Sequence, residues 1–244
     1  MSRVNTRAAT CFKIDEITFE VVRKRMKNLV LRIHPSSGTV RISAPLRISF
    51  DQVQAFARHH LPWILRQKDR LAATPQVQKS KFIDHEIHSL WGKPYSLRIH
   101  ELEAGSHSKK QSVEVIETEI SMRVVAGASA EARAALLERL YQERLSVVAS
   151  ALIQKWEPLM QVKSSGLDVR RMKTRWGSCH TGTRQIRLNS ELARVRIELT
   201  QYVVVHELTH LLEPSHNARF KAFMDQFLPN WRQLKNELNA NCPL

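Results

Sequence analysis

The segment from Tyr202 to His210 constrains the fold more than any other part of this chain. Its sequence, YVVVHELTH, places His206 and His210 four residues apart, with Glu207 beside the first histidine. On a helix this spacing is a rotation of about 400°, so both imidazoles leave the same face, about 6 Å apart along the axis. Apolar residues surround them on nearly all sides of such a helix, which is typical of a buried helix. The sequence therefore predicts a buried helix that carries three polar side chains.

A buried helix with the pattern His-Glu-x-x-His indicates a metal centre. Buried histidines and glutamates are rare unless they are paired or bound to a metal ion. Two imidazoles at this spacing can bind one tetrahedral Zn²⁺ at about 2.0–2.1 Å each, and Glu207 can reach a water on the metal without being a ligand. The alternative is an ordinary amphipathic helix with two solvent-facing histidines, and the apolar flanks argue against it.

A third ligand is expected from the proline that follows this helix. On an unbroken helix His216 would lie about 15 Å from His206 along the axis, too far to share a metal ion. Pro214 lacks an N–H and disfavours a helical conformation at Glu213, so the chain must turn there. The turn could return His216 to the metal and leave a fourth position open for water, as a catalytic zinc requires. Glu213, which continues the helical face, stays open as an alternative ligand.

The composition indicates a globular protein with a large excess of basic residues. The 244 residues are 43% hydrophobic and include 38 Lys and Arg against 23 Asp and Glu, a formal net charge of +15. Such a charge favours contact with polyanions, so nucleic acid is a candidate partner; a solvated basic surface is the alternative. No run approaches the roughly eighteen apolar residues of a membrane span, and no signal-peptide core is present. Three scattered cysteines imply no disulfide framework, so we expect a cytoplasmic protein without a membrane partner.

The N-terminal half reads as mainly β-structure after a loosely ordered arm at residues 1–16. Apolar and polar residues alternate in several short runs, which predicts strands. The runs lie at residues 17–21, 29–33, 40–43, 95–99, 113–116 and 120–125.

One helix is expected within this half. Ser49 and Gln52 have capping-box spacing, and an apolar period of 3.6 residues follows them. Pro62 should kink this helix or divide it. The basic cluster at residues 23–27 falls at an expected bend, where it is either a solvated turn or a contact for phosphate.

A long scaffold helix is expected to open the C-terminal half. Composition shifts at Gly127, and Ser129 is a suitable N-cap for a helix that runs to Met160. Its predicted apolar stripe comprises Leu137, Tyr141, Leu145, Val148, Leu152, Trp156 and Leu159.

Four motifs follow in the last third of the chain: Arg175–Cys179 (RWGSC), Ile186–Asn189 (IRLN), Tyr202–His210, and His216–Phe220 (HNxxF). Together they resemble the YgjP-like metallopeptidase family, which is distantly similar to SprT-like zinc proteases. The resemblance extends from about residue 17 to the end and is strongest in the C-terminal part. Two departures from the family pattern, Lys221 in place of an aromatic residue and no proline in residues 194–196, concern packing rather than chemistry.

The resemblance implies a site and a fold. His206, His210 and His216 would be the zinc ligands, and Glu207 the catalytic glutamate. The fold class would be α+β, with a β-rich N-terminal half and a zincin-like helical C-terminal half whose active-site helix lies under a small sheet. The expected regions are the arm at 1–16, a β-rich region at 17–127 with one helical segment, and the metallopeptidase region at 128–244.

The small sheet is expected to be a hairpin of residues 169–175 and 184–189. By resemblance, Gln185–Asn189 would be the edge to which an extended peptide adds by main-chain hydrogen bonds. Arg175 or Asn189 is the candidate stabiliser of the developing oxyanion, and for both the alternative is a structural role.

The function expected from these residues is a zinc-dependent metallopeptidase acting on peptide or protein substrates, with Glu207 as general base. One alternative is a nucleic-acid-associated binding module with a structural zinc. A protease that acts on DNA-bound proteins, by analogy with SprT-like proteases, and a hydrolase of another amide are further alternatives.

Overall fold

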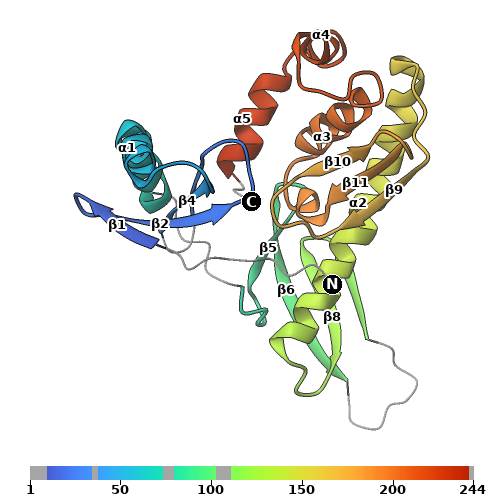
Figure 1. Ribbon diagram of the computed structural model, residues 1–244. Helices are drawn as coiled ribbons and strands as arrows, with labels where there is room; N and C mark the ends of the chain where they lie inside the picture. The colour runs from blue at the N-terminus through green and yellow to red at the C-terminus, as the bar shows by residue number, and fades with distance from the viewer. Residues whose placement is uncertain (1–9, 35–37, 74–79, 103–110, 242–244) are drawn as a thin grey trace, which may run out of the picture. The chain divides into compact units, whose positions relative to one another are not determined.

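The computed structural model describes residues 10–34, 38–73, 80–102 and 111–241 of the chain. The chain divides into two compact units, Met1–Lys79 and Ser80–Leu244 (Figure 1). The fold is α+β, as expected from the sequence, with sheets in the N-terminal half and helices in the C-terminal half. None of the described helices combines the length and the apolar composition that a bilayer crossing needs.

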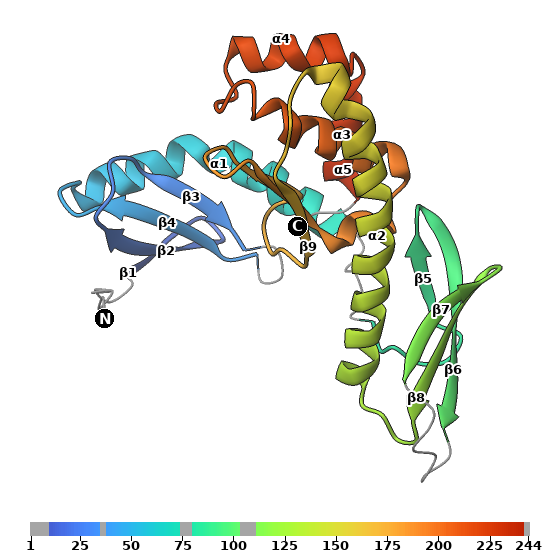
Figure 2. The ribbon, with the colours of Figure 1, turned by 90° about the vertical axis from the view of Figure 1, so that its right-hand side faces the viewer.

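The first unit is a four-stranded sheet with a long helix on one face (Figure 2). The strand order is β1-β2-β4-β3; β2 and β4 are parallel, and the other pairs are antiparallel. The elements are β1 (Thr10–Ile14), β2 (Ile17–Lys24), β3 (Val30–Ile33), β4 (Val40–Pro45) and α1 (Phe50–Ala73). Alternate residues of the central strands face the helix and form the core of this unit, namely Ile17, Phe19, Val21, Val40, Ile42 and Ala44, with Val53, Ala57 and Ile64 from α1.

Two expectations for this unit need correction, and one is confirmed. Within the segment expected to be a loose arm, β1 pairs with β2 through a tight turn in which Asp15 adopts a positive φ of 51°. Helix α1 is continuous through Pro62, so the alternative of a divided helix is wrong, while a kink at Pro62 stays a prediction. The capping box is present, because the Ser49 N–H donates to Gln52 Oε1 at 3.0 Å and the Gln52 N–H donates to Ser49 Oγ at 3.2 Å.

The second unit begins with another four-stranded sheet, in the order β5-β6-β8-β7. Its strands are β5 (Ile87–Leu90), β6 (Lys93–Leu102), β7 (Ser112–Ile116) and β8 (Glu119–Val125). Helix α2 (Ala130–Met160) lies along this sheet with its first half and along the C-terminal helices with its second half (Figure 2). Because α2 joins both parts into one core, the boundary between the units falls at residues 79 and 80, and not after residue 127 as composition suggested.

Helix α2 is capped as expected but is rotated from the predicted stripe in its second half. Ser129 is the N-cap, and its side chain accepts the Ala132 N–H. The predicted stripe fails at Leu159, which is 58% exposed, because the buried face beyond Leu145 lies one residue later than predicted at most turns. These buried positions are Ala149, Ile153, Trp156, Glu157 and Met160.

The C-terminal part consists of a three-stranded sheet, a short 3₁₀ helix, η1, and three α-helices. The sheet has the order β10-β11-β9, with β9 parallel to β11 and β10 antiparallel to it. The expected hairpin of residues 169–175 and 184–189 is therefore wrong in its first strand. That strand, β9, ends at Arg170 and is parallel to β11, and the antiparallel partner of β11 is β10. The bounds are β9 (Gly166–Arg170), β10 (Gly177–His180), β11 (Gln185–Asn189), η1 (Ser190–Arg194), α3 (Ile197–Thr209), α4 (Ala218–Phe227) and α5 (Trp231–Asn241).

Candidate metal centre

Helix α3 is the buried helix that the sequence predicts. Nine of its thirteen residues are buried, including Glu207. The helix ends at Thr209 with His210 as its C-cap, after which the N–H groups of Leu211 and Leu212 donate to the carbonyls of Leu208 and Thr209 at 3.0 and 2.9 Å. This tight turn satisfies the carbonyl groups at the helix end and reverses the chain before Pro214.

The turn brings His216 to the two histidines of α3. One nitrogen of each of His206, His210 and His216 lies within 4.8 Å of the others. The shortest approach is 2.9 Å, between His206 Nε2 and His216 Nε2. Within the part of the chain that the structure describes, no other three His, Cys, Asp or Glu side chains converge in this way. The spacing argument and the helix break thus predicted the convergence correctly.

The ring of Phe220 packs against all three imidazoles. Its ring centroid lies 4.9 Å from that of His206, 4.8 Å from that of His210 and 4.7 Å from that of His216. Phe220 is only 2% exposed and belongs to the first turn of α4, where Asn217 Oδ1 accepts its N–H as the N-cap. Phe220 is the last residue of the HNxxF motif, and its contact with the imidazoles depends on the turn that precedes α4.

The alternative ligand, Glu213, is engaged elsewhere. Its carboxylate accepts hydrogen bonds from the Ser215 N–H at 3.3 Å and the Ser215 hydroxyl at 3.0 Å. Its backbone carbonyl lies 3.3 Å from His210 Nδ1. A proton on Nδ1 that is donated to this carbonyl leaves Nε2 of His210 as the free lone pair, which is the common arrangement for a metal-ligating histidine.

The electrostatic surroundings keep the imidazoles of α3 neutral. Burial, together with the neighbouring His210 and His216, lowers the pKa of His206 to about 3. Burial also lowers the pKa of His210. A neutral imidazole has one ring nitrogen with a free lone pair, so His206 and His210 can each donate that lone pair to a cation. The donor set of three imidazoles therefore fits a borderline cation such as Zn²⁺.

Glu207 lies against the small sheet. It is 5% exposed, and burial raises its pKa to about 8, against the opposing effects of the Arg175 charge and the Cys179 N–H. A Cβ atom added at Gly177 of β10 would lie 2.7 Å from Glu207 Oε1 and 2.9 Å from its Cγ. Only glycine at position 177 leaves room for this carboxyl group. Gly177 is the glycine of the RWGSC motif; its residue type indicated a bend, whereas it is the first residue of β10 and contacts Glu207.

Asn189 is structural, and it does not have a free donor for an oxyanion. It is fully buried at the end of β11, and its Nδ2 donates to the carbonyls of Met172 and Arg175, both at 2.9 Å. Its Oδ1 accepts the N–H groups of Met172 at 3.2 Å and Glu191 at 3.3 Å. Since both amide hydrogens are used, Asn189 holds the loop that leads into β10. Arg175 is exposed and keeps its donors available among the residues that the structure describes.

The expected substrate edge also needs correction. Residues Gln185–Asn189 form β11, the central strand of the small sheet, and both sides of it are already paired. The strand nearest Glu207 is β10, which lies at an edge and pairs only with β11 among the described strands. Strand order depends on pairing between distant segments, so the local alternation pattern did not determine which strand is the edge.

The α+β fold and the metallopeptidase sequence features place the protein among the metallohydrolases. The chain belongs to the YgjP-like family, because the sequence pattern of the YgjP-like metallopeptidase domain matches residues 27–241. No curated protein matches this chain.

Among solved structures, the chain is similar to two archaeal metallopeptidase zymogens. Abylysin of Pyrococcus abyssi is 16% identical, with a TM-score of 0.35 over 37% of this chain and 91% of abylysin. Jannalysin of Methanocaldococcus jannaschii is 19% identical, with a TM-score of 0.34 over 37% of this chain and 92% of jannalysin.

Proposed function

We propose that this protein is a zinc-dependent peptidase whose zinc is held by His206, His210 and His216 and whose general base is Glu207. The observation that carries the proposal is the convergence of three imidazole nitrogens within 4.8 Å beside a buried carboxyl group. Membership of a metallopeptidase family supports it independently. A zinc ion bound there would lower the pKa of a water molecule and polarise the scissile carbonyl.

Glu207 moves the proton in this proposal. A cation held by the three histidines would favour the ionised form of Glu207 despite its burial. The carboxylate would then take a proton from the attacking water and later deliver it to the leaving amine. Close packing of Gly177 fixes the side chain in one place, so that the carboxylate needs little reorganisation during the reaction. Arg175, whose charge already acts on Glu207, is the candidate donor to the developing oxyanion.

The peptide substrate is proposed to add to the free edge of β10. The edge backbone groups of an extended strand can pair with a peptide in the manner of an additional β-strand. This strand contains Gly177, which packs on Glu207, so a peptide on β10 would lie next to the proposed base. Cytoplasmic localisation stays part of the proposal, on the basis of the scattered cysteines; Cys11 is exposed and free, and Cys242 lies outside the described residues.

The experiment is cleavage of a peptide library by the full chain loaded with Zn²⁺, compared with Glu207→Gln. The variant keeps the shape of the side chain and removes its basicity, so we expect the zinc content to be unchanged and kcat/KM to fall at least about 100-fold. Arg144→Gln, an exposed substitution on α2, is the matched control and should cleave at the wild-type rate. Wild-type cleavage by zinc-loaded Glu207→Gln would contradict the assignment of Glu207.

A further inference from the structure

The first unit carries a disproportionate share of the positive charge. Residues 1–79 contain 15 Lys and Arg and 5 Asp and Glu, which gives a formal +10 out of the +15 of the whole chain. The three histidines of the proposed metal site all belong to the second unit.

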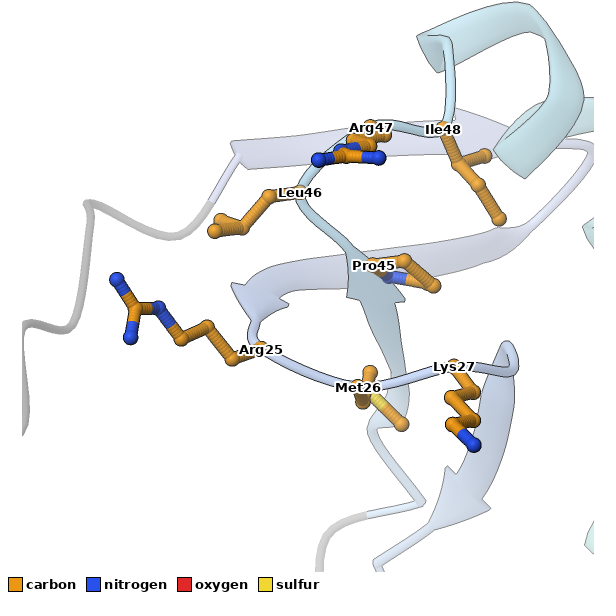
Figure 3. Close-up of a pocket in the computed structure, with 7 residues that line it drawn as sticks. All are labelled: Arg25, Met26, Lys27, Pro45, Leu46, Arg47 and Ile48. Carbon is orange, nitrogen blue, oxygen red and sulfur yellow. The ribbon is translucent and has the colours of Figure 1, made fainter.

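Part of this charge lines a hollow in the surface of the first unit. The hollow has a volume of about 810 Å³ and lies between the connection after β2 and the turn after β4 (Figure 3). Arg25 and Lys27 come from the connection, and Arg47 comes from the turn. All three are exposed, and none forms an ion pair with an acidic residue that the structure describes.

Hydrogen bonds from the half-buried Arg23 side chain hold the backbone on the two sides of this hollow together. The Arg23 guanidinium donates to the backbone carbonyls of Pro45, at 3.2 Å, and of Ile48. The Ile48 N–H closes the same turn on the Pro45 carbonyl at 3.4 Å. These hydrogen bonds connect the turn that carries Arg47 to the end of β2. The backbone positions of the cationic residues on both sides of the hollow are therefore set without a ligand.

A second hollow adjoins the first on the same sheet. It has a volume of about 530 Å³ and is lined by residues of β2, β3 and β4, including Lys24 and Arg32. Lys24 of the second hollow pairs in register with Pro45 of the first, so the two are neighbours across the β2–β4 ladder. Arg41 is also in the second hollow, but Glu20 neutralises it at 2.8 Å.

We propose that these two hollows form a continuous binding track for single-stranded nucleic acid, with Lys24, Arg25, Lys27, Arg32 and Arg47 as its phosphate contacts. An extended track of five cations suits a chain of regularly spaced phosphates, whereas a single anion would need only one hollow. The first hollow also contains Met26 and Leu46, and Leu46 is 48% exposed. These side chains offer an apolar surface to the faces of unpaired bases. A flat bilayer could not enter concave hollows. The proposal is independent of peptidase activity.

The test is fluorescence anisotropy of the full chain with a labelled 20-nucleotide single strand of mixed sequence, over a range of salt concentrations. Each phosphate contact on a single strand contributes about 0.7 to the slope of log K against log salt, so five contacts predict a slope of about −3.5. The variant Arg25→Gln/Lys27→Gln/Arg47→Gln should bind at least about tenfold more weakly and reduce the slope by about 2.

The control variant removes the same charge from exposed positions outside the track. Arg58→Gln/Arg66→Gln/Arg144→Gln lowers the net charge by the same amount and should change the affinity less than about threefold. An equal loss in both variants would show attraction to net charge alone and overturn the track. Undetectable binding of the strand at low salt, or tighter binding of a matched duplex or of phosphatidylserine vesicles, would overturn the assignment to single-stranded nucleic acid.

Discussion

Gly177 of β10 lies in contact with Glu207 of α3, so closely that a Cβ atom on the glycine would come within 2.7 Å of the carboxyl Oε1. Real Cβ atoms essentially never approach another heavy atom so closely. The added Cβ would also lie 3.0 Å from Val203 Cγ1, so it could not move away from Glu207 toward Val203. The contact joins the small sheet to the helix that carries the histidines. It makes the position of the proposed base depend on a residue that has no side chain.

The first prediction concerns this contact. Gly177→Ala should displace the Glu207 carboxyl group and lower kcat/KM by about 100-fold or more, because a misplaced base loses most of its contribution to proton transfer. Zinc content should be unchanged, since the three histidines do not touch position 177. Gly166→Ala is the matched control, because an added Cβ there meets nothing within 4 Å. Full activity in Gly177→Ala would mean that the contact has no catalytic importance.

The second prediction concerns the stability of the loop before β10. Asn189→Ala removes two donated and two accepted hydrogen bonds between this buried side chain and the backbone, so we expect a loss of about 2–4 kcal/mol in the free energy of unfolding. Urea denaturation of the metal-free protein measures it. Ser129→Ala, which removes an exposed N-cap from α2, should cost about 1 kcal/mol or less. Equal costs for the two substitutions would contradict the role assigned to Asn189.

The third prediction concerns the pH dependence of stability. Glu157 is 5% exposed near the end of α2; burial acts to raise its pKa, but hydrogen bonds from Lys163 and Ser164 outweigh burial and hold the pKa below its usual 4.5. The Lys163 Nζ lies at 2.6 Å, and the Ser164 N–H and hydroxyl lie at 2.7 and 2.6 Å. A group whose pKa is lowered on folding stabilises the protein above its unfolded-state pKa and loses that contribution as the pH falls through the folded-state pKa.

Wild-type protein should therefore lose stability as the pH falls below about 4.5, and Glu157→Gln should lose less. Both are measured by urea denaturation with a chelator present, so that metal binding does not contribute to the pH dependence. The wild type should be the more stable protein at about pH 6, and the difference should narrow toward about pH 3. A difference that does not change with pH would show that Glu157 has no lowered pKa.

The convergence of the three histidines was predictable from the sequence because its determinants are local. The histidine spacing on α3, the turn imposed by Pro214 and the N-cap Asn217 lie within one short segment, and each acts through backbone geometry that the residue type dictates. The capping box at Ser49 and the N-cap at Ser129 were predictable for the same reason.

The features that were missed depend on contacts between distant segments. Strand β11 is central because β9, from a separate part of the chain, pairs along its second side. The close approach of Gly177 to Glu207 exists only after the sheet has packed on α3. Strand β1 was different: the signal was present, because Asp15 tolerates the positive φ of a tight hairpin turn, and the alternation of Thr10–Ile14 precedes it.

The central claim is that three imidazoles hold one metal ion, and a zinc titration against a chromophoric chelator tests it most directly. The wild-type chain should bind one Zn²⁺, and His206→Ala, His210→Ala and His216→Ala should each weaken the affinity by at least about 100-fold, since each removes one of three protein ligands. His59→Ala, an exposed histidine in α1, is the control and should bind as the wild type does. Wild-type affinity and stoichiometry in His216→Ala would contradict the account.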